Sequence, residues 1–262
     1  MRLIFQPAEE GLGGAVKMIE DGLFERHPCD AVFGLHNAPG VPQGHLVFRD
    51  GAMMASSDTV VITLRGRGGH GAMPHRSADP VVAAASLIMA LQTIVSRNVD
   101  PQQAAVVTVG AIHGGEAANV IPESVTLTLT VRALDREVRK LLEQRITEIA
   151  HTQAASYGAQ AEVDYRHGYA VLVNTTPETA FARQVALDLF GPERVTLQGP
   201  PITASEDFAF MLEQRPGCYL MVGNGAGPGA CMVHNPGYDF NDANIRVGAA
   251  YWVALAQRWL RD

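Results

Sequence analysis

The stretch Thr59-Val60-Val61-Ile62-Thr63-Leu64-Arg65 decides the fold of this 262-residue chain, because the sequence pattern becomes regular there. Apolar residues recur at every second position, which predicts a half-buried β-strand. Beyond this strand the pattern predicts a helix over 80–95, strands over 104–113 and 125–133, a helix over 135–155 and a strand over 160–166. The order βαββαβ is typical of the ferredoxin-like arrangement, which is a self-contained unit.

The ends of this unit, near residues 57 and 168, should lie close together, as an inserted domain requires. We therefore predict that a domain of residues 57–168 interrupts a second domain made of residues 1–56 and 169–262. The pattern of the outer parts predicts strands over 3–5, 31–36, 44–48, 171–175 and 218–222, and helices over 14–21, 177–190 and 245–260. The predicted fold class is α/β.

The composition excludes several classes of partner. The formal net charge is -7, whereas nucleic-acid binding requires a basic face. We expect no membrane association, because no apolar run approaches the length of a membrane span, and we see no secretory signal. Cys29, Cys218 and Cys231 are scattered without metal-type spacing. Reduced thiols in a cytoplasmic protein are the simplest interpretation.

Two adjacent acids, Glu9 and Glu10, lie between the predicted first strand and the first helix. Such turns at the carboxyl ends of strands are where open α/β sheets bind their ligands. Neighbouring side chains on a turn point in different directions, so one acid can be a metal ligand and the other a proton carrier. The alternative is that both acids only stabilise the N-terminus of the helix.

Two histidines occupy similar positions in the predicted fold. His36 ends a predicted strand, and His234 lies in a loop before the last helix. Together with Glu9 and Glu10 they form a set of carboxylate and imidazole groups that suits zinc, manganese or cobalt. A metal that activates water, with a glutamate to accept the proton, predicts a hydrolase. Alternatively, His36 is a hydrogen-bonded loop residue.

Six motifs extend this interpretation. In chain order they are Phe5-Gln6-Pro7-Ala8-Glu9-Glu10-Gly11, Gly34-Leu35-His36, Gly68-Gly69-His70-Gly71-Ala72-Met73-Pro74-His75, Asn119-Val120-Ile121-Pro122, Ser205-Glu206-Asp207-Phe208 and His234-Asn235-Pro236. In this order they resemble the M20 metallopeptidase family, in the branch of aminoacylases, hippurate hydrolases and indole-acetyl-amino-acid hydrolases. The resemblance implies a two-metal amide hydrolase with an inserted lid and dimerisation domain, which would act on N-acyl amino acids as a homodimer.

The resemblance also implies roles for individual residues. Glu9 resembles the general base, and Glu10, His36 and His234 resemble metal ligands. His70 resembles the histidine that reaches across a dimer to hold the substrate carbonyl and the developing oxyanion, an electrostatic role that a fixed donor performs well.

Two further residues of the inserted domain are candidates for substrate binding. Asn119 resembles a lid residue near the substrate, and Arg132 is a candidate for the substrate carboxylate, which its fork of donors would match. The alternatives are that Asn119 only shapes the turn before Pro122 and that Arg132 is a solvated charge at a strand end. His75 is expected to orient its loop.

The sequence departs from the family in one respect. Relatives have a Cys-Gly-His-Asp-type segment before the Glu-Glu motif, which supplies a bridging thiolate and another histidine ligand. None of the three cysteines here has those neighbours, so we expect a chain that lacks its N-terminal segment and has impaired activity. The alternative functions are an inactive binding or dimerisation fragment, and a peptidase or deacetylase of the same family.

Overall fold

A computed structural model describes residues 1–11, 13–227 and 231–261, and the chain divides into two compact units. The outer unit comprises Met1–Met53, Leu172–Ile202 and Glu206–Asp262, and the inserted unit comprises Met54–Val171 and Thr203–Ser205. The division therefore falls within a few residues of the boundaries expected at 57 and 168. The exception is residues 203–205, which belong to the inserted unit although the sequence on either side of them belongs to the outer unit.

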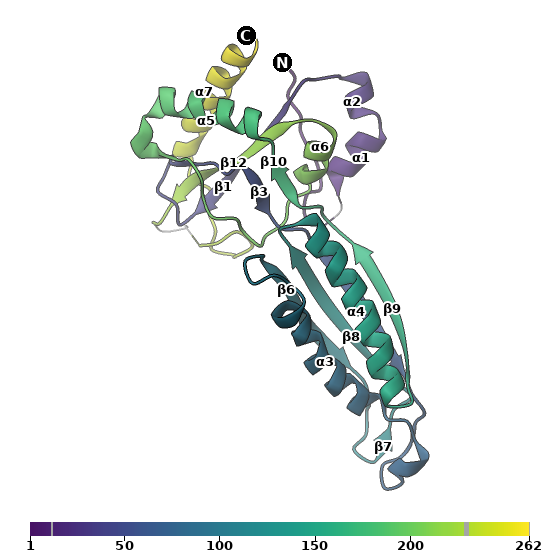
Figure 1. The fold of residues 1–262 in the computed structure, drawn as a ribbon. Coiled ribbons are helices and arrows are strands. Elements are labelled where there is room, and N and C mark those ends of the chain that lie inside the picture. Colours follow the sequence, from purple (N-terminus) through teal and green to yellow (C-terminus); the bar gives the residue numbers. More distant parts are fainter. Residues whose placement is uncertain (12, 228–230, 262) are drawn as a thin grey trace. The chain divides into compact units, whose positions relative to one another are not determined.

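The inserted unit is a four-stranded antiparallel sheet with two helices (Figure 1). Its strands are β4 (Asp58–Arg65), β6 (Ala105–His113), β8 (Ser124–Ala133) and β9 (Gln160–His167), in the spatial order β6-β8-β4-β9. Helices α3 (Pro80–Arg97) and α4 (Arg136–Ser156) pack against one another and share a buried cluster with the inward residues of β4 and β8. The βαββαβ order and the 3.6-residue and 2-residue periods expected from the sequence are present.

Capping residues begin both long helices. The side chain of Asp79 accepts hydrogen bonds from the backbone N–H groups of Val81 and Val82 before α3. Asp135 binds the first turn of α4 in the same way. These carboxylates satisfy N–H groups that have no partner within the helix, which explains why each helix begins where it does.

No apolar run that approaches a membrane span is expected from the sequence. Helix α3 corrects this expectation, because its length and apolar composition would be sufficient to cross a membrane. Its apolar composition has a structural explanation within the inserted unit. Ala83, Ala84, Leu87, Leu91 and Ile94 are completely buried in the cluster with the sheet. The sequence pattern of a core-facing helix and that of a membrane span overlap at this length.

The outer unit contains a mixed sheet in the order β1-β12-β2-β11. Its strands are β1 (Val32–Pro39), β12 (Gly217–Gly225), β2 (Leu46–Val47) and β11 (Val195–Thr196), and β3 (Gly51–Met54) pairs separately with β10 (Leu172–Asn174). The helices are α1 (Gly14–Glu20), α2 (Leu23–Arg26), α5 (Thr176–Phe190), α6 (Phe208–Gln214) and α7 (Ala243–Trp259), with a 3-10 turn η2 (Pro192–Arg194). Strands β1 and β12 are parallel, so His36 and Met221 lie side by side.

The strand expected over residues 3–5 is absent, which is a second correction. Residues 1–8 have no regular structure, and the side chains of Leu3 and Phe5 are 70% and 86% exposed. A strand requires a neighbour for its backbone N–H and C=O groups, and none of the described strands pairs with this segment. Strand β1 is therefore at the edge of its sheet as far as the described residues show.

Candidate active site

The turn that bears Glu9 and Glu10 has an unusual backbone. Ala8 has a φ of 53°, a left-handed conformation that is uncommon outside glycine. Gly14 is required at the start of α1, because a Cβ atom there would lie 1.7 Å from the carbonyl oxygen of Pro7. The side chain of Glu9 in this turn is half-buried, whereas that of Glu10 is exposed. Strained backbone of this kind often occurs at functional sites.

Glu9 lies in a group of three carboxylates. One oxygen from each of Glu9, Glu206 and Asp207 lies within 4.8 Å of the other two. Burial, together with the charges of Glu206, Glu10 and Asp207, raises the pKa of Glu9 to about 7. Burial likewise raises the pKa of Asp207 to about 6, although the N–H of Ala15 opposes the shift. A carboxyl with a pKa near 7 can accept and release a proton at neutral pH.

Glu206 and Asp207 are held firmly, with exposed fractions of 6% and 0%. The carboxylate of Glu206 accepts hydrogen bonds from the Tyr219 hydroxyl at 2.5 Å and from the N–H of Phe208 at 3.1 Å. Burial, together with the charge of Glu206 and this hydrogen bond, raises the pKa of Tyr219 well above its usual value. Tyr219 therefore remains a neutral donor toward Glu206.

The second acid of the turn lies near a histidine from the far end of the chain. The Nε2 atom of His234 is 3.7 Å from a carboxylate oxygen of Glu10, and both side chains are exposed. His234 has a φ of 65°, which makes it the second non-glycine residue with a left-handed backbone among the described residues. Residues separated widely in sequence thus meet beside the turn.

His36 is oriented by its own strand. Its Nδ1 atom lies 2.6 Å from the carbonyl oxygen of Asn37. A carbonyl oxygen can only accept, so Nδ1 bears the proton and Nε2 of the neutral ring retains a free lone pair. This is the arrangement by which metal-binding histidines are commonly fixed. The ring centroid of His36 is 6.4 Å from that of Tyr219, which in turn contacts Glu206.

The three expected metal ligands, Glu10, His36 and His234, do not form one group with atoms within 4.8 Å of each other. Over the part of the chain that the structure describes, such a group is formed only by Glu9, Glu206 and Asp207. Glu206 and Asp207 appear in the sequence analysis only as part of a motif, and neither of them is assigned a role there. Their motif was visible in the sequence, but only the fold brings it to Glu9.

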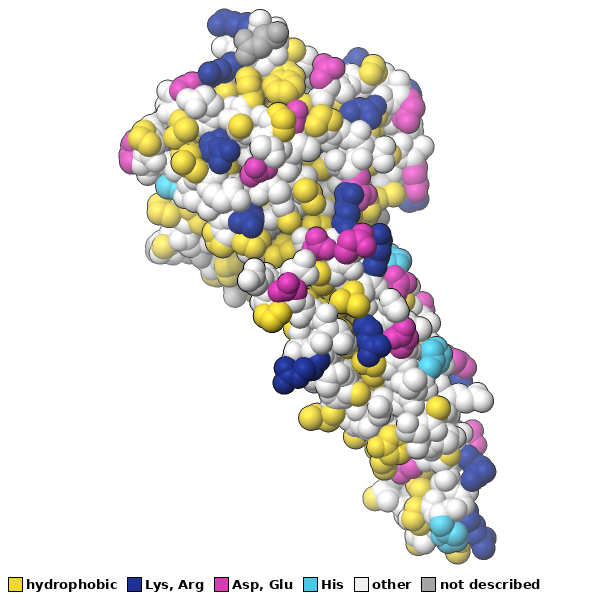
Figure 2. All heavy atoms as spheres, in the orientation of Figure 1, with side chains coloured by type: hydrophobic (Ala, Val, Ile, Leu, Met, Phe, Trp, Pro, Cys, Tyr) yellow, Lys and Arg dark blue, Asp and Glu magenta, His cyan; other side chains and the backbone are white. Residues whose placement is uncertain are grey.

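In the inserted unit, His70 and Asn119 are neighbours. Strand β5 (Gly69–His70) pairs with β7 (Val120–Ile121), and the carbonyl oxygen of Asn119 accepts the N–H of Gly71 at 2.7 Å. The N–H of Ala72 donates to Nδ1 of His70 at 3.0 Å. The proton of the neutral ring is therefore on the exposed Nε2, where it can be donated. Histidine side chains are visible at the end of the unit that bears β7 (Figures 1 and 2).

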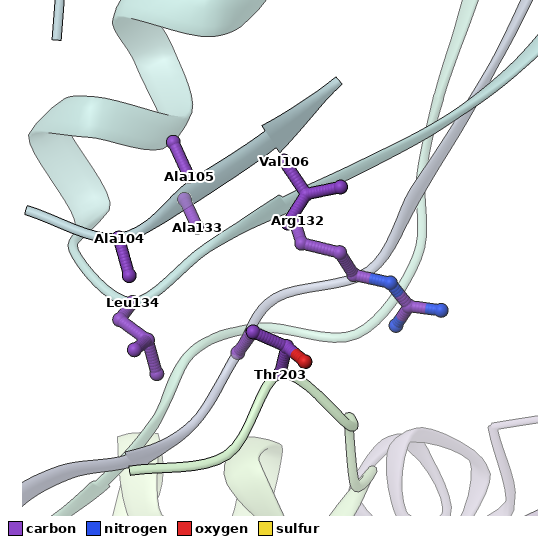
Figure 3. Close-up of a pocket in the computed structure, with 8 residues that line it drawn as sticks. Ala104, Ala105, Val106, Arg132, Ala133, Leu134 and Thr203 are labelled. Carbon is purple, nitrogen blue, oxygen red and sulfur yellow. The ribbon is translucent and has the colours of Figure 1, made fainter. Parts of the chain in front are cut away.

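Arg132 lies on β8, beside a small apolar recess (Figure 3). The recess includes Ala104, Ala105 and Leu134 and is too small to hold a water molecule. The guanidinium of Arg132 extends away from these side chains and donates to the Ser205 hydroxyl at 2.9 Å. Burial lowers the pKa of Arg132, and the charge of Asp58 opposes that shift. Arg132 thus has a neutral hydrogen-bond partner in Ser205, while the charge of Asp58 also acts on it.

A larger hollow of about 360 Å³ lies in the outer unit, lined in part by Asn224, Asp239, Phe240 and Asp242. Its volume is within the range of small-molecule sites. However, its carboxylates would repel an anionic substrate, so it does not suit the carboxylate end of an N-acyl amino acid.

Comparison with known proteins gives a consistent result. Residues 1–258 match the family described as Peptidase family M20/M25/M40. The chain is 44% identical over 261 residues to a hippurate hydrolase of Campylobacter jejuni, covering 100% of this chain and 67% of that relative. It is 38% identical over 262 residues to an N-acetyl-L-cysteine deacetylase of Bacillus subtilis, covering 100% of this chain and 61% of the relative.

A solved structure is also similar. The chain matches a dinuclear metal-binding peptidase from the M20 family of Bacillus subtilis with a TM-score of 0.80 and 29% identity. The match covers 96% of this chain and 63% of that protein. The chain therefore spans about two thirds or less of the length of these relatives.

Proposed function

The chain belongs to peptidase family M20/M25/M40, and we propose that it is the larger part of a metal-dependent amidohydrolase that cleaves N-acyl amino acids to a carboxylic acid and an amino acid. The observation that supports this most directly is that His234 lies 3.7 Å from Glu10, next to the half-buried carboxylate of Glu9. Similarity to hippurate hydrolase and N-acetyl-L-cysteine deacetylase supports an amide substrate of this class.

The chemistry of the expected ligands suits a divalent cation, although the three do not lie within 4.8 Å of one another. Glu10 and His234 supply an oxygen and a nitrogen 3.7 Å apart, and His36 supplies a free Nε2 because its Nδ1 is bound to Asn37. Mixed carboxylate and imidazole donors suit zinc, manganese or cobalt. A cation bound by these groups would act as a Lewis acid on the amide carbonyl and would lower the pKa of water.

Residues of this chain would carry out the proton transfers of the reaction. Glu9 accepts the proton of the attacking water and later delivers it to the nitrogen of the leaving amine. Its half-buried position among Glu206 and Asp207 supports this role, because burial and these neighbours together raise its pKa to about 7. Tyr219 and the N–H of Phe208 hold Glu206 in place beside it.

The inserted unit would bind substrate from a partner subunit. The Nε2 donor of His70 suits the developing oxyanion, while Arg132 suits the substrate carboxylate. Asn119 holds the His70 loop through its backbone and is a further candidate to contact substrate.

We also propose that the inserted unit mediates the homodimer. Strand β6 is at an edge of the sheet, and α3 leaves Val82 and Met89 50% and 71% exposed. An open strand edge beside apolar side chains is a common basis for association with a second copy. Both features lie in the unit that the resemblance identifies as the lid and dimerisation domain.

The length of the chain favours a second candidate function. The relatives are longer, and the outer unit has an open edge at β1 with Leu3 and Phe5 exposed. These features support a missing N-terminal segment, without which the chain would be a poorly active or purely binding fragment. The in-frame sequence upstream of Met1 would identify that segment by a cysteine and a histidine in a Cys-Gly-His-Asp-type motif.

The test compares the 262-residue chain with a version extended by any in-frame upstream segment. Each is assayed with hippurate and manganese, zinc or cobalt, and its metal content is measured by mass spectrometry. We expect the extended protein to bind two metals and to hydrolyse hippurate, and the short chain to be weakly active or inactive. Glu9→Gln should abolish hydrolysis and retain metal, whereas Glu20→Gln, an exposed change on α1, should leave both unchanged.

Two results would contradict the proposal. Wild-type turnover by Glu9→Gln would exclude Glu9 as the base. If the extended protein neither binds metal nor cleaves any N-acyl amino acid, the binding or dimerisation function is favoured instead.

A further inference from the structure

We propose that Asp207 is a positioning residue that anchors both flanks of the turn bearing Glu9 and Glu10, a role that rests on the proposed function of that turn. Asp207 is completely buried, and its two carboxylate oxygens have different partners. Oδ1 accepts a hydrogen bond from the side-chain amide of Gln6, before the turn. Oδ2 accepts one from the backbone N–H of Ala15, after the turn, at 2.9 Å.

Both contacts join the turn to a distant part of the chain, since Gln6 and Ala15 lie 201 and 192 positions from Asp207. The N–H of Ala15 belongs to the first turn of α1, where backbone donors have no partner within the helix. Ala15 is completely buried, so water cannot replace the carboxylate. Its helix begins after Gly13, which makes no side-chain cap. A residue from the far half of the chain therefore performs the capping role.

The anchor matters because the turn between its flanks is strained. Ala8 has a left-handed backbone, a conformation that persists when the surrounding structure holds it. The carboxylate of Glu9 accepts a hydrogen bond from the backbone N–H of Asp207. Asp207 thus holds Glu9 directly through its backbone and holds the chain on either side through its side chain.

The substitution Asp207→Asn tests the two-oxygen anchor specifically. An asparagine side chain has one acceptor oxygen and one donor NH2 group, so it cannot accept from Gln6 and Ala15 together. In the full 262-residue chain we expect amides over residues 9–17 to exchange with deuterium at least about tenfold faster in Asp207→Asn. The amides of β12 and α7 should keep their wild-type rates.

Two further variants separate anchoring from general destabilisation. Gln6→Ala removes the hydrogen bond between Asp207 and the flank before the turn, at a partly exposed residue. We expect a smaller increase in exchange over the same segment. Glu20→Gln removes an exposed acid from α1, where it pairs with Lys17, and should leave exchange unchanged. Unchanged exchange over residues 9–17 in both Asp207→Asn and Gln6→Ala, or equal acceleration throughout the outer unit, would overturn the proposal.

Titration with Mn²⁺ links the anchor to the site. We expect Asp207→Asn to weaken Mn²⁺ binding about tenfold and saturating Mn²⁺ to restore protection over residues 9–17, because bound metal holds Glu10. A wild-type chain that binds no Mn²⁺ would contradict the proposed metal site in this chain. The exchange comparison would then decide the role of Asp207 by itself.

Discussion

Asp58 provides a demanding test of what stabilises the inserted unit. It is the first residue of β4, with a completely buried side chain that forms a paired interaction with Arg139 of α4 at 2.9 and 2.5 Å. The same carboxylate accepts the Tyr165 hydroxyl at 3.2 Å and the N–H of Gly168 at 3.0 Å. One acid thus links the beginning of the unit to its last strand and to the segment that leaves it.

The expected cost of Asp58→Ala follows from these contacts. The Arg139 side chain is only 18% exposed, so removing Asp58 takes away the buried carboxylate that faces a largely buried charge. Breaking a buried ion pair on one side costs about 3–5 kcal/mol. For a unit of this size, roughly 4 °C per kcal/mol gives a fall in melting temperature of roughly 12–20 °C. The Asp164→Ala control removes an exposed pair with Arg166 and should leave the melting temperature almost unchanged.

The assay must report on the inserted unit, because a chain of two units need not unfold in one step. Urea unfolding followed by circular dichroism should be combined with hydrogen exchange of α4 and β9. The double variant Asp58→Asn with Arg139→Met should recover part of the lost stability, since no unpaired charge remains. A loss below about 1 kcal/mol for Asp58→Ala, or a loss equal to the control, would refute the reasoning.

Two other predictions concern pH and association. The pKa values of Glu9 and Asp207, about 7 and about 6, exceed their unfolded values, so the folded chain retains protons that the unfolded chain releases. The metal-free chain should therefore lose stability as pH rises from about 4 to 7, by on the order of 1 kcal/mol after solvent screening. In urea titrations, Glu9→Gln should reduce this dependence of stability on pH. A rise in stability over this pH range would contradict the assignment. Met89→Asp on α3 should weaken the homodimer at least about tenfold by analytical ultracentrifugation. The matched change Val253→Asp on α7, also at an exposed apolar residue, should leave the affinity of the homodimer unchanged. Equal loss of affinity in the two variants would exclude α3 as the interface.

Local pattern predicted the inserted unit well. The alternation from Thr59 to Arg65, the proline and apolar spacing of α3 and the acid before each long helix are properties of neighbouring residues. They specify a strand or a helix without reference to distant parts of the chain. The same reasoning failed for residues 3–5, because a strand exists only where another strand pairs with it.

The candidate site divides in the same way. The sequence by itself determined which residue types are available: the adjacent acids Glu9 and Glu10, the histidines at strand ends and loops, and the family to which their motifs belong. Tertiary structure alone decided that Glu206 and Asp207 join Glu9 and that His234 lies beside Glu10. The physical reason is that pKa shifts, metal-binding geometry and anchoring depend on distances of a few ångströms between residues roughly two hundred positions apart, and only the packed fold sets those distances.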